Sequence, residues 1–210
     1  MLIQQFVVGP VETNCYIIHK EGEKEALIID PGAAGRQLAE HLRKEGLRLA
    51  AVLLTHGHAD HAGGIGDLLR ELKDRVPVIA YEGEKRTLAD PNYNLSSWIL
   101  SHSQVFHADL FMRDGEEKDL AGLHFRLLAT PGHTEGGCCF YFPYENVLFS
   151  GDSLFAGSLG RTDFPGGSVA LLVRSVKEKL MTLPEGTRVL PGHEGETTIG
   201  EERVNNPYLL

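Results

Sequence analysis

The sequence predicts a mixed α/β fold in which two mixed β-sheets are covered by helices. Three observations predict it. Apolar strand-like runs open the chain, amphipathic helical stretches alternate with strands in its middle, and further strands precede a last long helix. The 210 residues, of which 42% are hydrophobic, suffice for a large core. No linker, low-complexity stretch or strong repeat divides the chain, so we expect one domain spanning 1–210.

The first half of the chain is expected to alternate strands with helices. The strands are expected at 2–8, 13–19, 26–30, 49–55 and 76–81. The helices are expected at 36–45, 64–75 and 82–89. Leu38 and Leu42 recur at helical spacing in the first helix, which Gly46 is suited to end. Leu68 and Leu72 do the same in the second, so both helices should bury one side.

The second half is expected to be richer in strands. The segment 90–106 is rich in Asn and Ser and is interpreted as a loop insertion near the functional site. It holds the only tryptophan, Trp98, and Tyr93; local packing is favoured over substrate contact for both. Strands are expected at 117–120, 124–129, 138–142, 147–150 and 188–190, and a helix at 168–180.

Charge and composition exclude several classes of partner. The formal net charge is -9, with acids and bases spread along the chain, which argues against nucleic acid or an anionic membrane as a partner. The N-terminus lacks a basic region followed by a long apolar stretch, and no apolar run approaches ~20 residues. We therefore expect no signal peptide, no membrane span and a cytoplasmic location. The sequence does not predict the oligomeric state.

The three cysteines, Cys15, Cys138 and Cys139, are interpreted as reduced and buried. An odd count with two adjacent residues is a poor disulfide framework. Cys138 and Cys139 could be metal ligands, but neighbours on a strand point to opposite faces. A role as small core residues is favoured.

Polar motifs of metal-ligand type follow several of the expected strands. The motif Thr55–His61 reads THGHADH, and single candidates follow later strands in Pro-Gly-His, Gly-Asp and Gly-His contexts. The candidate ligands are His56, His58, Asp60, His61, His133, Asp152 and His193. His56 and His58 are two residues apart, so in extended backbone they point to the same side. The other five histidines have no partner pattern and are assigned surface or packing roles; they are His19, His41, His102, His107 and His124.

Five imidazoles and two carboxylates suit a pair of divalent metals. One metal is expected to bind His56, His58 and His133, and the other Asp60, His61 and His193. Asp152 suits a position that bridges both. Two metals ~3.5–4 Å apart can hold a shared water as hydroxide, which would be the nucleophile, and Asp60 could accept its proton. Zinc is the expected metal, with iron and manganese as alternatives.

With these motifs in this order, the sequence resembles the metallo-β-lactamase superfamily along almost its whole length. The closest likeness is to short glyoxalase II-like hydrolases, carried by the stretch 151–165 and the tail 199–207. The resemblance implies a four-layer αββα sandwich with the metals at one edge. It also implies hydrolysis of a small acyl thioester, similar to that of hydroxyacylglutathione. Asp152 fits glyoxalase II-type hydrolases better than true β-lactamases, which usually carry another residue there.

Arg161 stands where glyoxalase II carries a basic residue that helps to hold glutathione. A guanidinium can grip a carboxylate in two places, although Arg161 could equally pair with Asp163. The chain departs from glyoxalase II at Asp163 and Gly195, where that family carries tyrosines. It is also expected to lack the helical C-terminal domain that completes the glutathione site. These departures leave the thiol carrier open.

A persulfide dioxygenase is the main rival prediction, since those superfamily members share the stretch 160–164. On that interpretation His133, Asp152 and either His56 or His58 would bind a single iron. The continuation 165–167 and the Gly192-His193 ending favour the hydrolase. Lactone or phosphodiester hydrolysis is a further alternative. A metal-binding module without catalysis would need an incomplete site, whereas all seven positions are filled.

Overall fold

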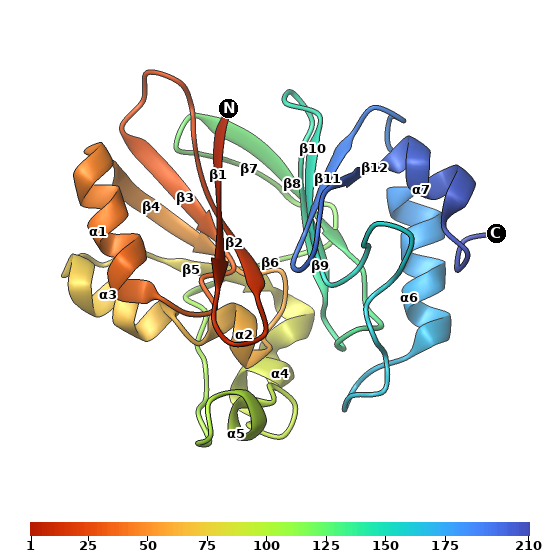
Figure 1. Cartoon of the computed structure of the whole chain (residues 1–210), viewed down its shortest axis with the longest axis horizontal. Coiled ribbons are helices and arrows are strands. Elements are labelled where there is room, and N and C mark those ends of the chain that lie inside the picture. The colour runs from red at the N-terminus through yellow and green to blue at the C-terminus, as the bar shows by residue number, and fades with distance from the viewer.

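A computed structural model describes residues 1–210 and shows two six-stranded sheets lying face to face between two layers of helices (Figure 1). The first sheet has the order β1 (Leu2–Val8), β2 (Thr13–His19), β3 (Glu25–Ile29), β4 (Arg48–Leu53), β5 (Val78–Tyr81) and β6 (Leu110–Met112). The second has the order β12 (Thr197–Thr198), β11 (Arg188–Pro191), β10 (Val147–Gly151), β9 (Cys138–Phe142), β8 (Leu123–Ala129) and β7 (Glu117–Leu120). Both sheets mix parallel and antiparallel pairs, as expected.

Helices cover the outer face of each sheet, which confirms the αββα sandwich (Figure 1). On the first sheet lie α1 (Gly35–Glu45) and α3 (Ile65–Leu72). On the second lie α6 (Val169–Ser175), its π-helical continuation η2 (Val176–Leu180) and α7 (Ile199–Asn205). Four short helical segments complete the fold: α2 (Ala59–Ala62), η1 (Glu82–Glu84), α4 (Lys85–Ala89) and α5 (Ser96–Ile99). None of these helices combines the length and apolar character that a membrane crossing requires.

Alternation along the strands divides the apolar side chains among three cores. In β3, Leu27 packs between the sheets, whereas Ile28 packs beneath α1 and α3. In β9, Phe140 lies between the sheets and Cys139 faces the helices of the second sheet. Because both faces of these strands are covered, their sequences are nearly continuous apolar runs.

The prediction that Cys138 and Cys139 point to opposite faces is confirmed. Cys138 belongs to the core between the sheets and Cys139 to the core under α6. All three cysteines are buried and free. Burial raises the pKa of Cys139 to about 11, so this thiol stays protonated and unreactive near neutral pH.

The expectations missed the strands β6 and β12 and the helices α2 and α7, and they misread the segment 90–106. β6 and β12 are edge strands of three and two residues, too short to show a pattern of their own. α7 does carry a signal: Thr198 accepts a hydrogen bond from the backbone of Glu201, in the T-x-x-E arrangement of a capping box. The segment 90–106 is not loop throughout, because it contains the helical turn α5. The helix expected at 64–75 ends at Leu72 because Lys73 adopts a left-handed conformation.

Candidate metal centre

The seven predicted ligands lie close together, carried by loops that follow strands of both sheets. His56 and His58 follow β4, and α2 carries Asp60 and His61 directly after them. His133, Asp152 and His193 follow β8, β10 and β11 of the second sheet. Their ligand atoms form three overlapping groups, each within 4.8 Å: His56, His58 and His133; His56, His61 and Asp152; and Asp60, His61 and His193.

The first predicted set forms a triangle of imidazole nitrogens. Nδ1 of His58 lies 3.1 Å from Nε2 of His56 and 3.0 Å from Nε2 of His133. Burial lowers the pKa of His58 to about 3 and that of His56 well below its ordinary value. Neutral imidazoles whose nitrogens converge in this way offer lone pairs to one point, which is the arrangement a divalent metal requires.

The second predicted set gathers around the carboxylate of Asp60. Its Oδ2 lies 3.5 Å from Nε2 of His61 and 3.3 Å from Nε2 of His193. Asp152 lies between the two sets: Oδ1 is 3.4 Å from Nε2 of His61, and Oδ2 is 3.4 Å from Nε2 of His133. A single carboxylate therefore faces members of both predicted sets.

Two buried atoms show that this cluster fits metal ions. Nε2 of His61 and Oδ1 of Asp152 are buried and have no hydrogen-bond partner in the protein. Buried polar atoms are nearly always paired, and leaving one unpaired costs about 1–3 kcal/mol. Imidazole and carboxylate groups suit zinc, iron and manganese alike, so the donor set does not select the metal.

Asp30, which is not among the predicted ligands, orients histidines of both sets. Its Oδ2 accepts hydrogen bonds from Nδ1 of His61 at 3.0 Å and from the Thr55 hydroxyl at 2.6 Å. Thr55 Oγ1, having donated its proton, accepts from Nδ1 of His56 at 3.1 Å. Both rings therefore carry their proton on Nδ1 and direct the lone pair of Nε2 into the centre. The available signal was that Asp30, like the predicted ligands, directly follows an apolar strand.

Glycines before the candidate ligands let the loops approach one another closely. A Cβ on Gly192 would lie 2.3 Å from Oδ1 of Asp152 and 2.6 Å from Cε1 of His61. A Cβ on Gly151 would lie 2.3 Å from the Thr55 hydroxyl, and this residue has a φ of +49°. No larger residue fits at either position without moving the ligand loops.

The loop that carries His193 is held from the opposite sheet. The buried side-chain amide of Asn14, in β2, donates to the carbonyl oxygens of Pro191 at 3.0 Å and Glu194 at 2.9 Å. The Tyr16 hydroxyl donates to the same Pro191 carbonyl at 2.7 Å. These bonds join residues about 180 positions apart in the chain and fix the two sheets relative to each other at the cluster.

A cavity of about 700 Å³ opens above the cluster. Its lining includes His58, Asp60, His133, Asp152 and His193. The other lining residues come from four segments: Pro10, Val11, Leu95, Trp98, Ile99, Phe155, Arg161, Phe164 and Glu194. The interpretation of Trp98 as a packing residue is wrong, because its side chain is 79% exposed and lines this cavity. Tyr93, by contrast, packs locally, with the Arg86 guanidinium 4.0 Å over its ring.

Arg161 lies on the cavity wall and is paired with Asp163. Nε and Nη2 donate to the two carboxylate oxygens at 2.8 and 2.7 Å. The hydrogen bonds from Arg161 lower the pKa of Asp163 to about 2. The expected pairing of Arg161 with Asp163 is therefore present in the structure. Contact between Arg161 and a substrate carboxylate stays a prediction.

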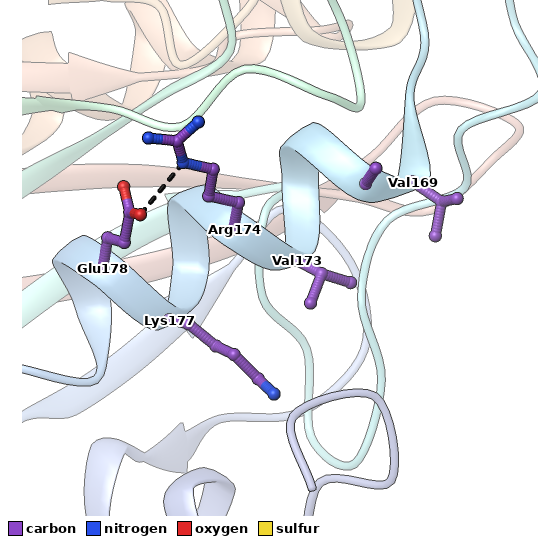
Figure 2. Close-up of a pocket in the computed structure, with 6 residues that line it drawn as sticks. Val169, Val173, Arg174, Lys177 and Glu178 are labelled. Atoms are coloured by element: carbon purple, nitrogen blue, oxygen red, sulfur yellow. Dashed lines mark hydrogen bonds and ion pairs between the residues drawn. The ribbon is translucent and has the colours of Figure 1, made fainter.

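A second hollow, of about 650 Å³, lies on the surface of α6 and is not the site (Figure 2). Residues of one helix and its continuation line it, including Val169, Val173 and Lys177, with an ion pair between Arg174 and Glu178. It contains no histidine or cysteine, so nothing there matches the predicted chemistry.

Comparison with known proteins identifies the family. The metallo-beta-lactamase superfamily profile matches residues 8–193. The chain belongs to this superfamily. It is a metal-dependent enzyme with a histidine-rich site.

Three relatives place the chain within the superfamily. It is 36% identical to the hydroxyacylglutathione hydrolase GloC of Haemophilus influenzae, over 100% of this chain and 98% of that protein. The crystal structure of BLEG-1, a B3 metallo-beta-lactamase, is 38% identical and superposes with a TM-score of 0.91, covering 99% of both chains. A di-iron-bound form of TTHA1623 is 33% identical with a TM-score of 0.84, covering 98% of this chain and 100% of that one.

Proposed function

We propose that the protein is a two-metal hydrolase that cleaves a small acyl thioester. The proposed ligands are His56, His58 and His133 for one metal, Asp60, His61 and His193 for the other, and Asp152 between them. The observation that carries this proposal is the position of Asp152, whose two oxygens lie 3.4 Å from nitrogens of both sets. Full-length similarity to the hydroxyacylglutathione hydrolase GloC supports the thioester as substrate.

The groups of the chain supply the remaining steps of hydrolysis. Two bound divalent ions would lower the pKa of a shared water and polarise the substrate carbonyl. Asp60 lines the cavity and is the group proposed to accept the proton of the attacking water. The thiol leaves as a thiolate without an acid, because a free thiol has a pKa of ~8.5. We propose zinc as the metal; similarity to a di-iron protein supports iron as the alternative.

A second candidate function is hydrolysis of a β-lactam. Similarity to BLEG-1, described as a B3 metallo-beta-lactamase, favours it. A β-lactam nitrogen needs a proton as it leaves, unlike a thiolate, so this reaction would require an acid at the site. The persulfide dioxygenase would use one iron and leave several of the seven candidate ligands without a role.

One set of measurements on anaerobically purified protein separates these functions. Metal content per chain is measured, and the same sample is assayed with lactoylglutathione, with a chromogenic cephalosporin, and for oxygen uptake with glutathione persulfide. Two metals per chain with thioester cleavage supports the proposal. Two metals with cephalosporin turnover alone would make it a β-lactamase. One iron with oxygen uptake would make it a dioxygenase.

A further inference from the structure

One wall of the cavity consists of apolar side chains that have no part in the proposed hydrolysis. Leu95, Trp98 and Ile99 come from α5 and the residue before it, and Phe164 faces them from the loop after β10. The indole of Trp98 meets the Phe164 ring edge to face, with centroids 6.4 Å apart. Among them only Trp98 is largely exposed. Apolar side chains that line a concave site usually mark a ligand-binding surface.

The wall begins directly beside the candidate ligands. The ring of Phe164 lies 5.7 Å from that of His58 and 6.5 Å from that of His133, edge to face in both cases. A group attached to a carbonyl held at the cluster would therefore reach Phe164 first and Trp98 next. The aromatic pair is placed to contact the part of the substrate adjacent to the bond that breaks.

Trp98 is exposed, yet the segment that carries it is firmly held. The buried side-chain amide of Asn94 donates to the Gln104 carbonyl at 2.9 Å, and the Ser96 hydroxyl donates to the same oxygen at 3.0 Å. The Asn94 carbonyl in turn accepts from the backbone N–H of Ala59, the first residue of α2. Because α2 carries Asp60 and His61, this hydrogen bond connects the segment that holds Trp98 to the helix that carries two candidate ligands.

Charge on the cavity lining offers little basis for choosing between ligands that carry the same charged groups and differ only in an apolar group. Arg161 is the only arginine or lysine that lines the cavity, and its Nε and Nη2 both donate to Asp163. The guanidinium also stacks 4.1 Å over the Phe164 ring. Glu194 adds a negative charge to the lining. Selection among substrates therefore relies mainly on apolar contact.

We propose that Trp98 and Phe164 form an apolar specificity wall, and that the preferred substrates are thioesters with an aromatic or bulky apolar group adjacent to the scissile carbonyl. The identity of the substrate class rests on the proposed thioester hydrolysis, whereas the wall itself can be tested by binding alone. Aromatic contacts of this kind are worth up to about tenfold in affinity.

The binding experiment uses Trp98 as its own reporter, because it is the only tryptophan in the chain. Metal-loaded protein is titrated with two thioethers that cannot be hydrolysed, S-benzylglutathione and S-methylglutathione, and the tryptophan emission is followed. The emission should respond saturably, with a Kd for the benzyl compound about tenfold lower than for the methyl compound. Equal affinities for the two compounds would overturn the proposed specificity wall. Binding detected by calorimetry without a change in tryptophan emission would overturn it as well.

The kinetic experiment compares lactoylglutathione with mandeloylglutathione, which differ by a phenyl group in place of a methyl group. W98A should reduce the ratio of kcat/KM for mandeloylglutathione to that for lactoylglutathione by about tenfold, through KM, and W98F should restore most of it. Tyr144→Ala is the matched control, since Tyr144 is 81% exposed but lies outside the cavity. An unchanged ratio in W98A would refute the proposal. A benzyl preference in binding without turnover of either thioester would refute thioester hydrolysis and leave the wall standing.

Discussion

Oδ2 of Asp30 lies 3.0 Å from Nδ1 of His61, on the side of the ring that faces away from the metal centre. The same carboxylate orients His56 through Thr55, so one buried residue sets the tautomers of histidines in both predicted metal sets. Asp30 is therefore a positioning residue for the whole centre.

Asp30→Asn should weaken metal binding by about 10–100-fold, because its single amide oxygen replaces two carboxylate oxygens that accept from Thr55 and His61. The measurement is competition for metal with a chromophoric chelator. Asp109→Asn is the control, since Asp109 accepts a backbone hydrogen bond from Val78 at the start of β5 and is not among the cluster or cavity residues. Equal affinities in both variants would show that Asp30 does not orient the ligands.

Asp152→Ala should remove the carboxylate that faces both sets. Turnover should fall by at least about 100-fold, and the metal content should drop below two per chain. Metal analysis and the thioester assay on one preparation check both. A variant that stays active and keeps two metals would contradict the assignment of Asp152 as the bridging ligand.

Gly192→Ala should disrupt the centre, because its Cβ would lie 2.3 Å from Oδ1 of Asp152. We expect weaker metal binding and a lower melting temperature. Gly195→Ala is the matched control three residues along the same loop, where a Cβ would meet no atom within 4 Å. If the two variants bind metal equally well, a side chain at position 192 fits without displacing the ligands, and the prediction is wrong.

Arg161→Ala should raise KM for a substrate with a carboxylate more than it lowers kcat, if Arg161 leaves Asp163 for the substrate. Arg126→Ala, which removes an exposed arginine paired with Glu117, is the control. Steady-state kinetics on lactoylglutathione check this. Unchanged kinetics in both variants would leave Arg161 with a structural role only.

Glu84 should make stability depend on pH. Its carboxyl group is fully buried and accepts from the backbone N–H of Gly57, between His56 and His58. Burial raises its pKa from 4.5 to about 7. The folded protein then holds a proton that the unfolded chain releases between pH 4.5 and 7, so the free energy of unfolding falls as pH rises through this window.

Glu84→Gln cannot titrate, so its unfolding free energy should change less over the same window, by up to about 1.4 kcal/mol per pH unit. Urea unfolding of both proteins from pH 4.5 to 7.5 measures the difference. Parallel curves would mean that Glu84 titrates alike in the folded and unfolded states.

Local sequence was enough to predict most of the fold and to single out seven side chains that the fold brings together. Successive side chains of a strand point to opposite faces of its sheet. Continuous apolar runs, such as those of β3 and β9, therefore indicate strands that are covered on both faces. His56 and His58 share a side because they are two residues apart. Such patterns depend only on near neighbours in the chain.

Contacts between distant residues were decided by the tertiary structure alone. The hydrogen bonds from Asn14 to the loop of His193, and from His61 to Asp30, join segments that are distant in the chain. No local pattern records which segments meet. Trp98 shows the same limit. Its residue type suggests burial, and only the folding of 90–106 over α2 places it on the cavity wall. The sequence by itself determined which groups are present and on which strand ends they stand. The packing of the two sheets determined which of them meet, because a carboxylate or an indole acquires its role from the groups within a few ångströms of it.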